Sequence, residues 1–488
     1  MNVRLKKWMS SAAAALLATT LMFAPVQANA EQERTIIDES IYDLLIDRYF
    51  NGSGENDQEV NTQDIEVFAG GDFAGLISRG DHVINLGYTM ISIGSVFPTE
   101  RYDGSMVTTY EGFEPHFGTE EEFREVLTYY KGKDIGVMVD FPLSNVSPNH
   151  EWAQANPDWV AGNADGQVQF DLNNVAVKQA LTERIVAFVE AYNIQGLRLT
   201  GIETADTAFL NEIIAAVKAV KDIYVIANSE SAADFDAQFR DDFADILSES
   251  YKNVDLPATD VVKYAEADGK PTLNAFDTIW SDRITVAITS PEGNGYPPNR
   301  LPLAFAATLF MPGVPLTTYG SEIGMNGVAG AESHQLYNFK TNEELIEQIA
   351  DMQYLRNSSW TLRNGDFEVL ENKDGYLVLK RSSEEETWIV VINNTAMTQR
   401  INIPVDMLGE KKEVRGMFES EIIRTNTEGF YPIILDREKV EIYQVIDEKG
   451  FNTSYIVALG IVYVLFTAFV IIVVKRGRKR RAEQDAAK

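Results

Sequence analysis

Residues 196–203 of this 488-residue chain read Gly196-Leu197-Arg198-Leu199-Thr200-Gly201-Ile202-Glu203. Leu197 and Leu199 alternate with Arg198, as in a short strand, and a run with helical spacing (residues 175–192) precedes them. A helix, a strand and then a turn of small residues is the order of one repeat in a (β/α) barrel. In such barrels the side chains at the carboxyl ends of the strands carry the chemistry, and here these are Arg198, Thr200 and Glu203.

Strand-like segments recur along residues 31–365, each separated from the next by room for a helix. The eight segments are residues 42–46, 88–93, 136–140, 196–199, 223–227, 244–247, 273–276 and 314–318. Two of the helices have explicit start signals, because Thr119 with Glu122 and Thr341 with Glu344 have the spacing of a capping box. Eight such pairs predict an α/β fold, a closed (β/α)8 TIM barrel over residues 31–365. A long excursion after the third strand, residues 141–172, predicts a small inserted subdomain.

The pattern changes after residue 365. Short alternating segments between turns occupy residues 376–380, 387–392, 401–403, 412–414 and 440–444. Alternation with a period of two residues is typical of strands that are buried on one face. Residues 366–447 are therefore predicted to form a C-terminal all-β sandwich.

Both ends of the chain carry targeting patterns. Three basic residues precede an apolar run, and Ala28-Asn29-Ala30 offers a cleavage site, so residues 1–30 are predicted to be a signal peptide. Residues 455–474 are uncharged and apolar over a length that can span a bilayer, and a basic tail (475–488) follows. Positive charge favours the cytoplasmic side. We therefore expect a single-pass protein of the cell membrane with an extracellular barrel and sandwich.

Composition excludes several classes of function. The chain has no cysteine, which excludes disulfides, thiol nucleophiles and thiolate zinc sites. Its four histidines are too scattered for a metal cluster, and we expect His150 and His334 at the surface. Residues 31–474 carry 71 acidic and 32 basic residues, a net charge of −39, which excludes nucleic acid as a partner. The absence of cysteine together with a single anchor suggests a Gram-positive bacterial surface.

A longer motif closes the predicted barrel. Residues 311–325 read MPGVPLTTYGSEIGM, which resembles the eighth-strand segment PGxPxxYYGxExGM of the alpha-amylase family (glycoside hydrolase family 13). Residues 41–52, 70–76, 116–119 and 362–367 resemble further segments of that family. The resemblance covers nearly all of residues 31–444. The resemblance implies that this protein acts in carbohydrate metabolism and has the barrel of a family that cleaves α-glucans.

The positions that match the family's catalytic carboxylates hold other residues. The resemblance places Thr200 at the nucleophile, Asn228 at the general acid and Trp280 at the third carboxylate. A retaining glycosidase needs two carboxyl groups about 5–5.5 Å apart, and a threonine hydroxyl without an adjacent base is a poor nucleophile. We therefore expect no confident catalytic residue. The family's pocket residues that remain are Asp140, Arg198, Asp277 and Arg283.

Two alternatives stay open at these positions. Glu203 and Glu230 follow the fourth and fifth predicted strands and are either a displaced acid/base pair or solvated loop carboxylates. Trp280 either fills the sugar subsite or offers a stacking platform for a sugar ring, and we favour filling because a buried indole is more often packed.

Three functions are compatible with this sequence. We favour an inactive amylase-like protein at the cell surface that binds an α-glucan or maltooligosaccharide, or a partner protein. The second is an active glycoside hydrolase or transglycosidase that uses displaced carboxylates. The third is a scaffold subunit that docks to an envelope protein complex.

A polar loop after the first predicted strand resembles the calcium loop of some family members. Its side chains and glycines offer hard oxygen ligands in a turn, which suits Ca²⁺. An Asx-rich turn without a metal has the same composition. We expect a calcium ion at Asn51, Ser53, Asn56, Asp57, Gly70 and Asp72.

Overall fold

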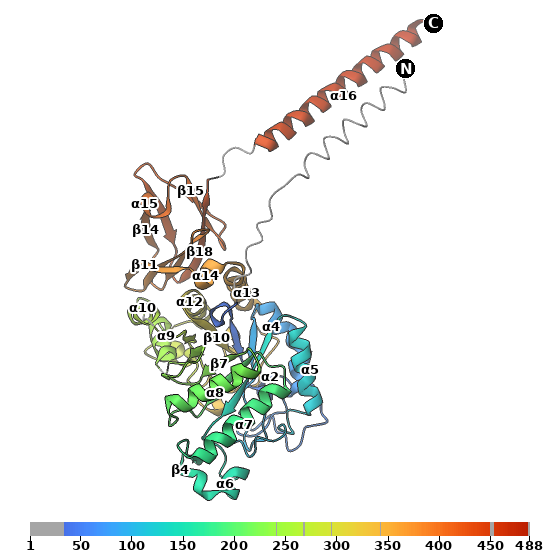
Figure 1. Ribbon diagram of the computed structural model, residues 1–488. Helices are drawn as coiled ribbons and strands as arrows, with labels where there is room; N and C mark the ends of the chain where they lie inside the picture. The colour runs from blue at the N-terminus through green and yellow to red at the C-terminus, as the bar shows by residue number, and fades with distance from the viewer. Residues whose placement is uncertain are drawn as a thin grey trace. The chain divides into compact units, whose positions relative to one another are not determined.

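The computed structural model describes residues 34–240, 242–266, 269–293, 295–341, 343–448 and 453–486 (Figure 1). The predicted signal peptide, residues 1–30, lies outside the described residues.

Eight parallel strands form a nearly closed barrel, which confirms the predicted fold. They are hydrogen-bonded in the order β8-β7-β6-β3-β2-β1-β10-β9, and a parallel bridge between Gln238 and Thr272 brings the two ends of this order together. The strands are β1 (Ile41–Asp43), β2 (Met90–Ser92), β3 (Gly136–Pro142), β6 (Gly196–Thr200), β7 (Tyr224–Ala227), β8 (Ala237–Gln238), β9 (Leu273–Asn274) and β10 (Val314–Thr318).

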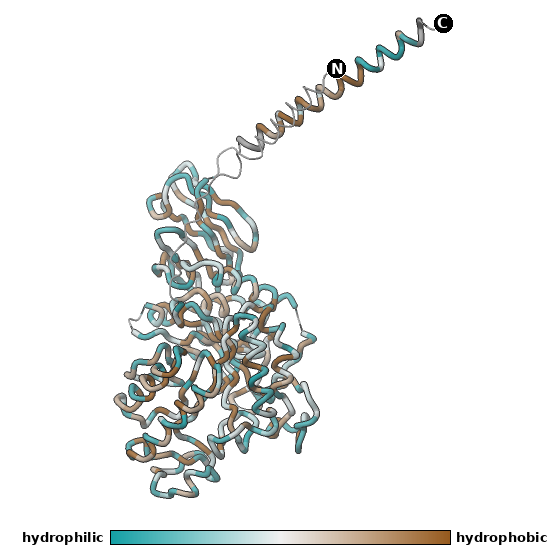
Figure 2. The backbone as a smooth tube through the Cα atoms, turned by 45° about the vertical axis from the view of Figure 1, so that its right-hand side comes forward, coloured by the Kyte–Doolittle hydropathy of each residue, from teal (hydrophilic) through white to brown (hydrophobic). Residues whose placement is uncertain are grey.

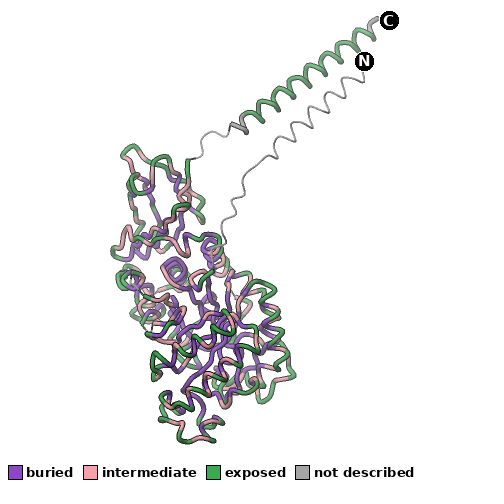
Figure 3. Tube along the Cα trace, viewed as in Figure 1, coloured by how far each residue is buried: buried purple, intermediate pink, exposed green. Residues whose placement is uncertain are grey.

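Helices surround these strands and bury their apolar faces against them (Figures 1 and 3). They are α2 (Ile46–Tyr49), α3 (Phe73–Ser78), α4 (Gly80–Leu86), α5 (Glu120–Lys131), α7 (Val175–Ala191), α8 (Thr207–Val220), α9 (Phe243–Tyr251), α10 (Thr259–Ala265), α11 (Ile284–Thr289), α12 (Pro297–Phe310), α13 (Glu343–Ser358) and α14 (Trp360–Asn364). Helix α5 begins at the predicted capping box, where Thr119 and Glu122 each bond the other's backbone N–H. Between β3 and α7, the inserted segment contains α6 (Glu151–Ala155) and a hairpin of β4 (Val160–Ala164) and β5 (Gln167–Phe170).

The sixth predicted strand, residues 244–247, is wrong. These residues lie in α9, whose buried positions Phe243, Leu247 and Tyr251 recur every four residues. Short apolar runs do not distinguish a strand from a buried helix face. The strand at this place in the barrel is β8, which has only two residues and therefore no periodic pattern to detect.

The C-terminal domain consists of two antiparallel sheets. The larger sheet has the order β11-β12-β13-β18-β15-β16, and β14 pairs with β17. Apolar side chains from both sheets, among them Val378, Val391 and Ile433, form one buried cluster between them. The elements are β11 (Asp366–Lys373), β12 (Tyr376–Ser382), β13 (Thr387–Asn393), β14 (Gln399–Pro404), α15 (Val405–Leu408), β15 (Lys412–Gly416), β16 (Ile422–Arg424), β17 (Phe430–Leu435) and β18 (Lys439–Asp447).

The last helix, α16 (Thr453–Ala486), is long and apolar enough in residues 457–483 to cross a membrane. Its residues in this range are exposed, as the colouring of the tube in Figure 3 indicates. Figure 2 shows hydrophobic residues along its first part and hydrophilic residues towards its C-terminal end. This arrangement is compatible with a single-pass anchor.

Candidate functional site

Arg198 lies inside the barrel between two carboxylates. Its Nε and Nη2 donate to Oδ1 and Oδ2 of Asp140, both at 2.8 Å, in a bidentate pair. The same guanidinium donates to Asp43 at 3.1 and 3.3 Å. All three side chains are buried. Burial raises the pKa of Asp140, and the adjacent Arg198 opposes this shift. The alternation of β6 explains the placement, because Leu197 and Leu199 pack in the apolar core on the opposite face.

The indole of Trp280 covers this ion pair. Its ring centroid lies 5.1 Å from Arg198 Cζ, within cation–π range. Phe239 meets the indole edge to face, with centroids 5.8 Å apart. The backbone N–H of Trp280 donates to Thr278 Oγ1 (3.2 Å), which fixes the turn that carries the ring. Trp280 therefore occupies the space above Arg198.

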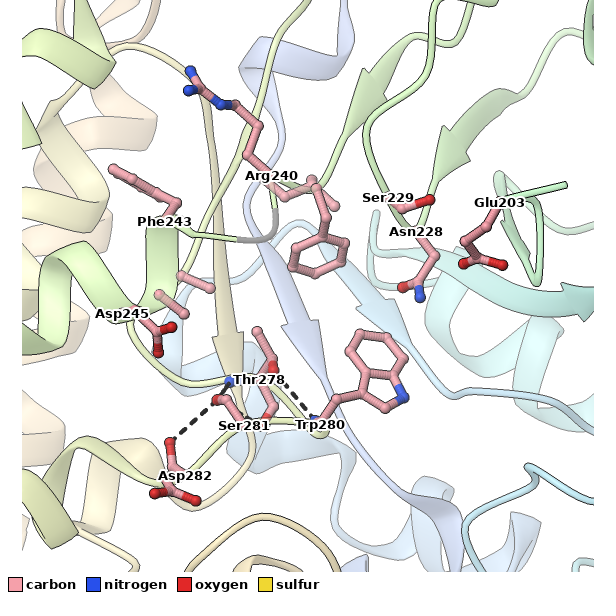
Figure 4. Close-up of a pocket in the computed structure, with 14 residues that line it drawn as sticks. Glu203, Asn228, Ser229, Arg240, Phe243, Asp245, Thr278, Trp280, Ser281 and Asp282 are labelled. Atoms are coloured by element: carbon pink, nitrogen blue, oxygen red, sulfur yellow. Dashed lines mark hydrogen bonds between the residues drawn. The ribbon is translucent and has the colours of Figure 1, made fainter. Parts of the chain in front are cut away.

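Trp280 is nevertheless 47% exposed, so our premise of a fully packed indole is wrong. Its exposed part faces a cavity of about 550 Å³ (Figure 4). Sequence reasoning predicted Asn228, Glu203 and Trp280 near this site and missed the remaining wall. The cavity is lined by Glu203, Asn228, Ser229, Phe239, Arg240, Phe243, Ala244, Asp245, Leu273, Ala275, Thr278, Trp280, Ser281 and Asp282.

Two polar atoms of the cavity wall are buried and lack a hydrogen-bond partner among the described residues. They are Asn228 Oδ1 and Ser229 Oγ, which follow the carboxyl end of β7. Thr200, at the carboxyl end of β6, is half-buried, and its carbonyl accepts from the Leu143 N–H (2.8 Å). The site thus presents a hydroxyl at the end of β6 and an amide directly after β7.

The two candidate displaced acids do not share this cavity. Glu203 is exposed and lies beside Asn228 (Figure 4). Glu230 forms an ion pair with Arg240 (3.0 Å) and lines a separate cavity of about 420 Å³. The other carboxylates of the first cavity, Asp245 and Asp282, lie on the far side of Trp280 from Glu203 (Figure 4).

Asp277 and Arg283 form a second buried pair and do not line the cavity. Asp277 accepts from the Ile284 N–H (2.6 Å) and Ser321 Oγ (2.8 Å), and Arg283 Nη1 lies 3.8 Å from its carboxylate. Arg283 also donates twice to the Ser333 carbonyl, at 3.1 and 2.9 Å. Burial raises the pKa of Asp277. This pair fixes both ends of the loop that carries Trp280.

The surface position predicted for His150 and His334 is wrong, since both are buried. His334 Nε2 lies 2.6 Å from the Ile279 carbonyl and Nδ1 2.9 Å from the Tyr102 hydroxyl. Burial lowers the pKa of His334, and it lowers that of His150 to about 4. Each ring has aromatic neighbours, which sequence spacing does not reveal.

The structure brings part of the expected calcium loop together. The Asn51 side-chain amide lies 2.8 and 3.0 Å from the two oxygens of Asp57, and a Cβ at Gly70 would come within 2.7 Å of both side chains. Asp72 instead accepts from backbone N–H groups, including those of Gly52 and Ser53.

The Asn56 side-chain amide donates a hydrogen bond to the His116 carbonyl. In the described part of the chain, no three His, Asp or Glu side chains are arranged to hold a metal ion. A calcium ion here would therefore depend on Asp57 together with amide and carbonyl oxygens, ligands that Ca²⁺ accepts.

Comparisons with known proteins agree with this architecture. The alpha amylase catalytic domain matches residues 43–161, and the alpha-amylase C-terminal domain matches residues 365–443. An Anoxybacillus alpha-amylase structure is 30% identical, with a TM-score of 0.81 over 86% of this chain and 100% of that chain. The alpha-amylase of Geobacillus thermoleovorans, solved with acarbose, is 27% identical, with a TM-score of 0.80 over 86% of this chain and 100% of that one.

A curated relative, the beta/alpha-amylase of Paenibacillus polymyxa, is 24% identical over 83% of this chain. The chain spans only 38% of that relative's length. The barrel, the C-terminal sheets and these similarities lead to one conclusion: the chain belongs to the alpha-amylase family of glycoside hydrolases.

Proposed function

We propose that this protein is a membrane-anchored, extracellular member of the family that binds an α-glucan without cleaving it. The observation that carries the proposal is the type of residue at the three positions that the resemblance matches to catalytic carboxylates. They are Thr200 at the end of β6, Asn228 directly after β7 and Trp280 in the turn that follows β9. Helix α16 supports the anchor by its length and hydropathy.

The absence of cleavage follows from the chemistry of these groups. The Asn228 amide cannot give a proton to a leaving oxygen. Among the described residues, no basic side chain is hydrogen-bonded to the Thr200 hydroxyl, so nothing activates it as a nucleophile. General acid–base catalysis alone contributes about 10²–10⁴-fold to a rate. Because the nucleophile and the acid act together, the loss of either removes most of the rate enhancement that the two provide. Glu203 and Glu230 line different cavities, and Glu230 is held in an ion pair with Arg240, which argues against their acting as the close pair that a retaining mechanism needs.

Binding is supported by the wall of the cavity. A half-exposed indole offers an apolar face to a sugar ring. Glu203, Ser281 and Asp282 on the wall of the same cavity offer polar contacts to its hydroxyls. The cavity volume lies within the range of about 300–1,000 Å³ common for small-molecule sites. A neutral saccharide suits this combination.

Two assays on the full chain in detergent test the proposal. Reducing ends released from starch, maltooligosaccharides and pullulan are expected to stay at background, while calorimetry with maltoheptaose is expected to show binding. Turnover that Glu203→Gln or Glu230→Gln abolishes would support the displaced-acid alternative. If the protein does not bind glucan, and a pull-down from solubilised membranes recovers another protein with it in stoichiometric amount, the result would support a scaffold subunit of an envelope complex.

Trp280→Ala is expected to weaken maltoheptaose binding about 10–100-fold, because the variant loses the stacking face. Calorimetry or intrinsic fluorescence measures the change. The matched control is Trp360→Ala, which removes an indole of similar exposure (40%) from α14 and is expected to leave affinity unchanged. Equal affinity in wild type and Trp280→Ala would contradict a binding role for the indole.

We also propose that the loop around Asn51 and Asp57 binds calcium. Millimolar Ca²⁺ is expected to raise the Tm of the full chain by about 2–4 °C, since an ion that binds only the folded state stabilises it. Asp57→Ala is expected to abolish the increment, whereas Asp64→Ala, in the same exposed loop, is expected to keep it. An equal increment in both variants would place the ion elsewhere.

A further inference from the structure

One wall of the cavity beside Trp280 is formed by helix α9. Its first three residues, 243–245, line the cavity (Figure 4). The barrel strand that precedes this helix, β8, has only two residues and meets the next strand through the bridge from Gln238 to Thr272. A strand of two residues forms few backbone hydrogen bonds, so the helix after it depends on other contacts for its position.

The far end of α9 is held by the C-terminal domain. Asn394 directly follows β13 and is 1% exposed. Its side-chain Nδ2 donates to three carbonyl groups in the last turn of α9 and in the segment after it, those of Ser250 (2.9 Å), Asn253 (3.1 Å) and Leu256 (3.2 Å). The last carbonyl groups of a helix have no partner within the helix. Asn394 therefore caps α9 from another domain.

The other polar atoms of Asn394 strengthen this joint. Its Oδ1 accepts from Nη1 of the buried Arg300 on α12, and its backbone carbonyl accepts from the Asp255 N–H (2.7 Å). Its own N–H donates to the Gly375 carbonyl within the C-terminal domain (2.9 Å). The Asp255 carboxylate accepts from the Ala396 N–H (3.0 Å). Buried polar groups that have their hydrogen bonds are costly to displace, so these contacts fix the end of α9.

We propose that Asn394 is a positioning residue for the glucan site, through which the C-terminal domain fixes the cavity wall formed by residues 243–245. The inference rests on the proposed function, because it takes the ligand of that cavity to be an α-glucan. Helix α9 has nine residues, and its internal hydrogen bonds make it a rigid rod, so a shift at one end moves the other. Asn394 is not among the residues that line the cavity, and it acts through α9.

The preceding residue offers a matched control. Asn393 is also buried, and its Nδ2 also donates to three carbonyl groups, but these belong to the C-terminal domain itself, to Met397, Leu435 and Asp436. Asn393→Asp and Asn394→Asp make the same chemical change, since each replaces a donor amide by a carboxylate. The two variants differ in which domain loses its hydrogen bonds.

The test compares these variants with the wild type, as the full chain in detergent and below the Tm of each. Asn394→Asp is expected to weaken maltoheptaose binding in calorimetry about 5–10-fold and to speed amide hydrogen exchange in α9 about 10-fold, the order expected for one lost hydrogen bond. Asn393→Asp is expected to lower the Tm and leave both quantities unchanged. A purely structural role of Asn394 would lower the Tm without separating the two affinities.

Equal affinity in Asn394→Asp and wild type, or the same loss of affinity in both variants, would overturn the proposal. If the wild type does not bind maltoheptaose, the proposed function fails and hydrogen exchange decides this inference separately. Faster exchange at residues 243–245 in Asn394→Asp, but not in Asn393→Asp, would then support the positioning of the wall. Unchanged exchange there would overturn it.

A second variant covers the case that Asn394→Asp does not fold. Asp255→Gly removes the bond to the Ala396 N–H and keeps a residue that tolerates the φ of 60° at this position. It is expected to weaken maltoheptaose binding and to speed exchange in α9 in the same direction. Asp374→Gly, at a φ of 48° in the turn between β11 and β12, is its control and is expected to change neither. Equal results for these two variants would overturn the proposal.

Discussion

Placing carboxylates at the three positions that the sequence resemblance matches to the family's catalytic groups is expected to create glycosidase activity in this protein. The variant combines Thr200→Asp, Asn228→Glu and Trp280→Asp. The scaffold beneath these positions is retained, since Arg198 is already held by Asp140 and Asp43. Replacing the indole also opens the space above Arg198. Release of reducing ends from maltoheptaose is expected to exceed the wild-type background by at least about 10³-fold, since nucleophile and acid act together.

A matched variant separates charge from shape in this experiment. It is a triple variant that introduces amides in place of the carboxylates: Thr200→Asn, Asn228→Gln and Trp280→Asn. The amide side chains have nearly the same size as the carboxylates but cannot transfer protons. This triple variant is expected to stay at background and to fold as the active one does. Equal rates in the two variants would show that the restored carboxylates do not perform the reaction, and the proposed reason for inactivity would fail.

Replacing Arg198 is expected to be the most destabilising single substitution in the barrel. Arg198→Met leaves Asp140 and Asp43 buried beside each other without a cation. Removing one partner of a buried ion pair costs about 3–5 kcal/mol in the free energy of unfolding. Chemical denaturation of the full chain measures this loss, together with the denaturant midpoint.

Two further variants test whether the loss of stability comes from the buried ion pair. Arg124→Met breaks an exposed ion pair with Glu120 and is expected to leave the free energy of unfolding nearly unchanged. The double variant Arg198→Met with Asp140→Asn is expected to recover part of the loss, because one stranded charge is removed. If Arg198→Met were as stable as wild type, the ion pair would have no structural role.

Much of the barrel could be predicted because its strongest segments are locally consistent. The predicted strand 314–318 coincides with β10, in which every residue is buried, and the predicted start of α5 coincides with its capping box. The strand β8 could not be predicted, because two residues carry no period and its closure depends on the bridge from Gln238 to Thr272. Phe239, which follows β8 and supports Trp280, was missed for the same reason.

The site was harder to predict than the fold because side-chain direction depends on contacts distant in sequence. Glu230 follows Asn228 by two residues, yet its ion pair with Arg240 places it in another cavity. The exposure of Trp280 depends on Arg198 below it and Phe239 beside it, which come from other strands. Residue type alone favoured a packed indole.

The ion pair inside the barrel has a consequence for judging sequences of this kind. Arg198 contacts two acidic groups that the protein has kept, so the folded state depends on it whether or not any bond is cleaved. A search that scores this arginine as a mark of hydrolysis would therefore count a requirement of folding as a sign of enzymatic competence.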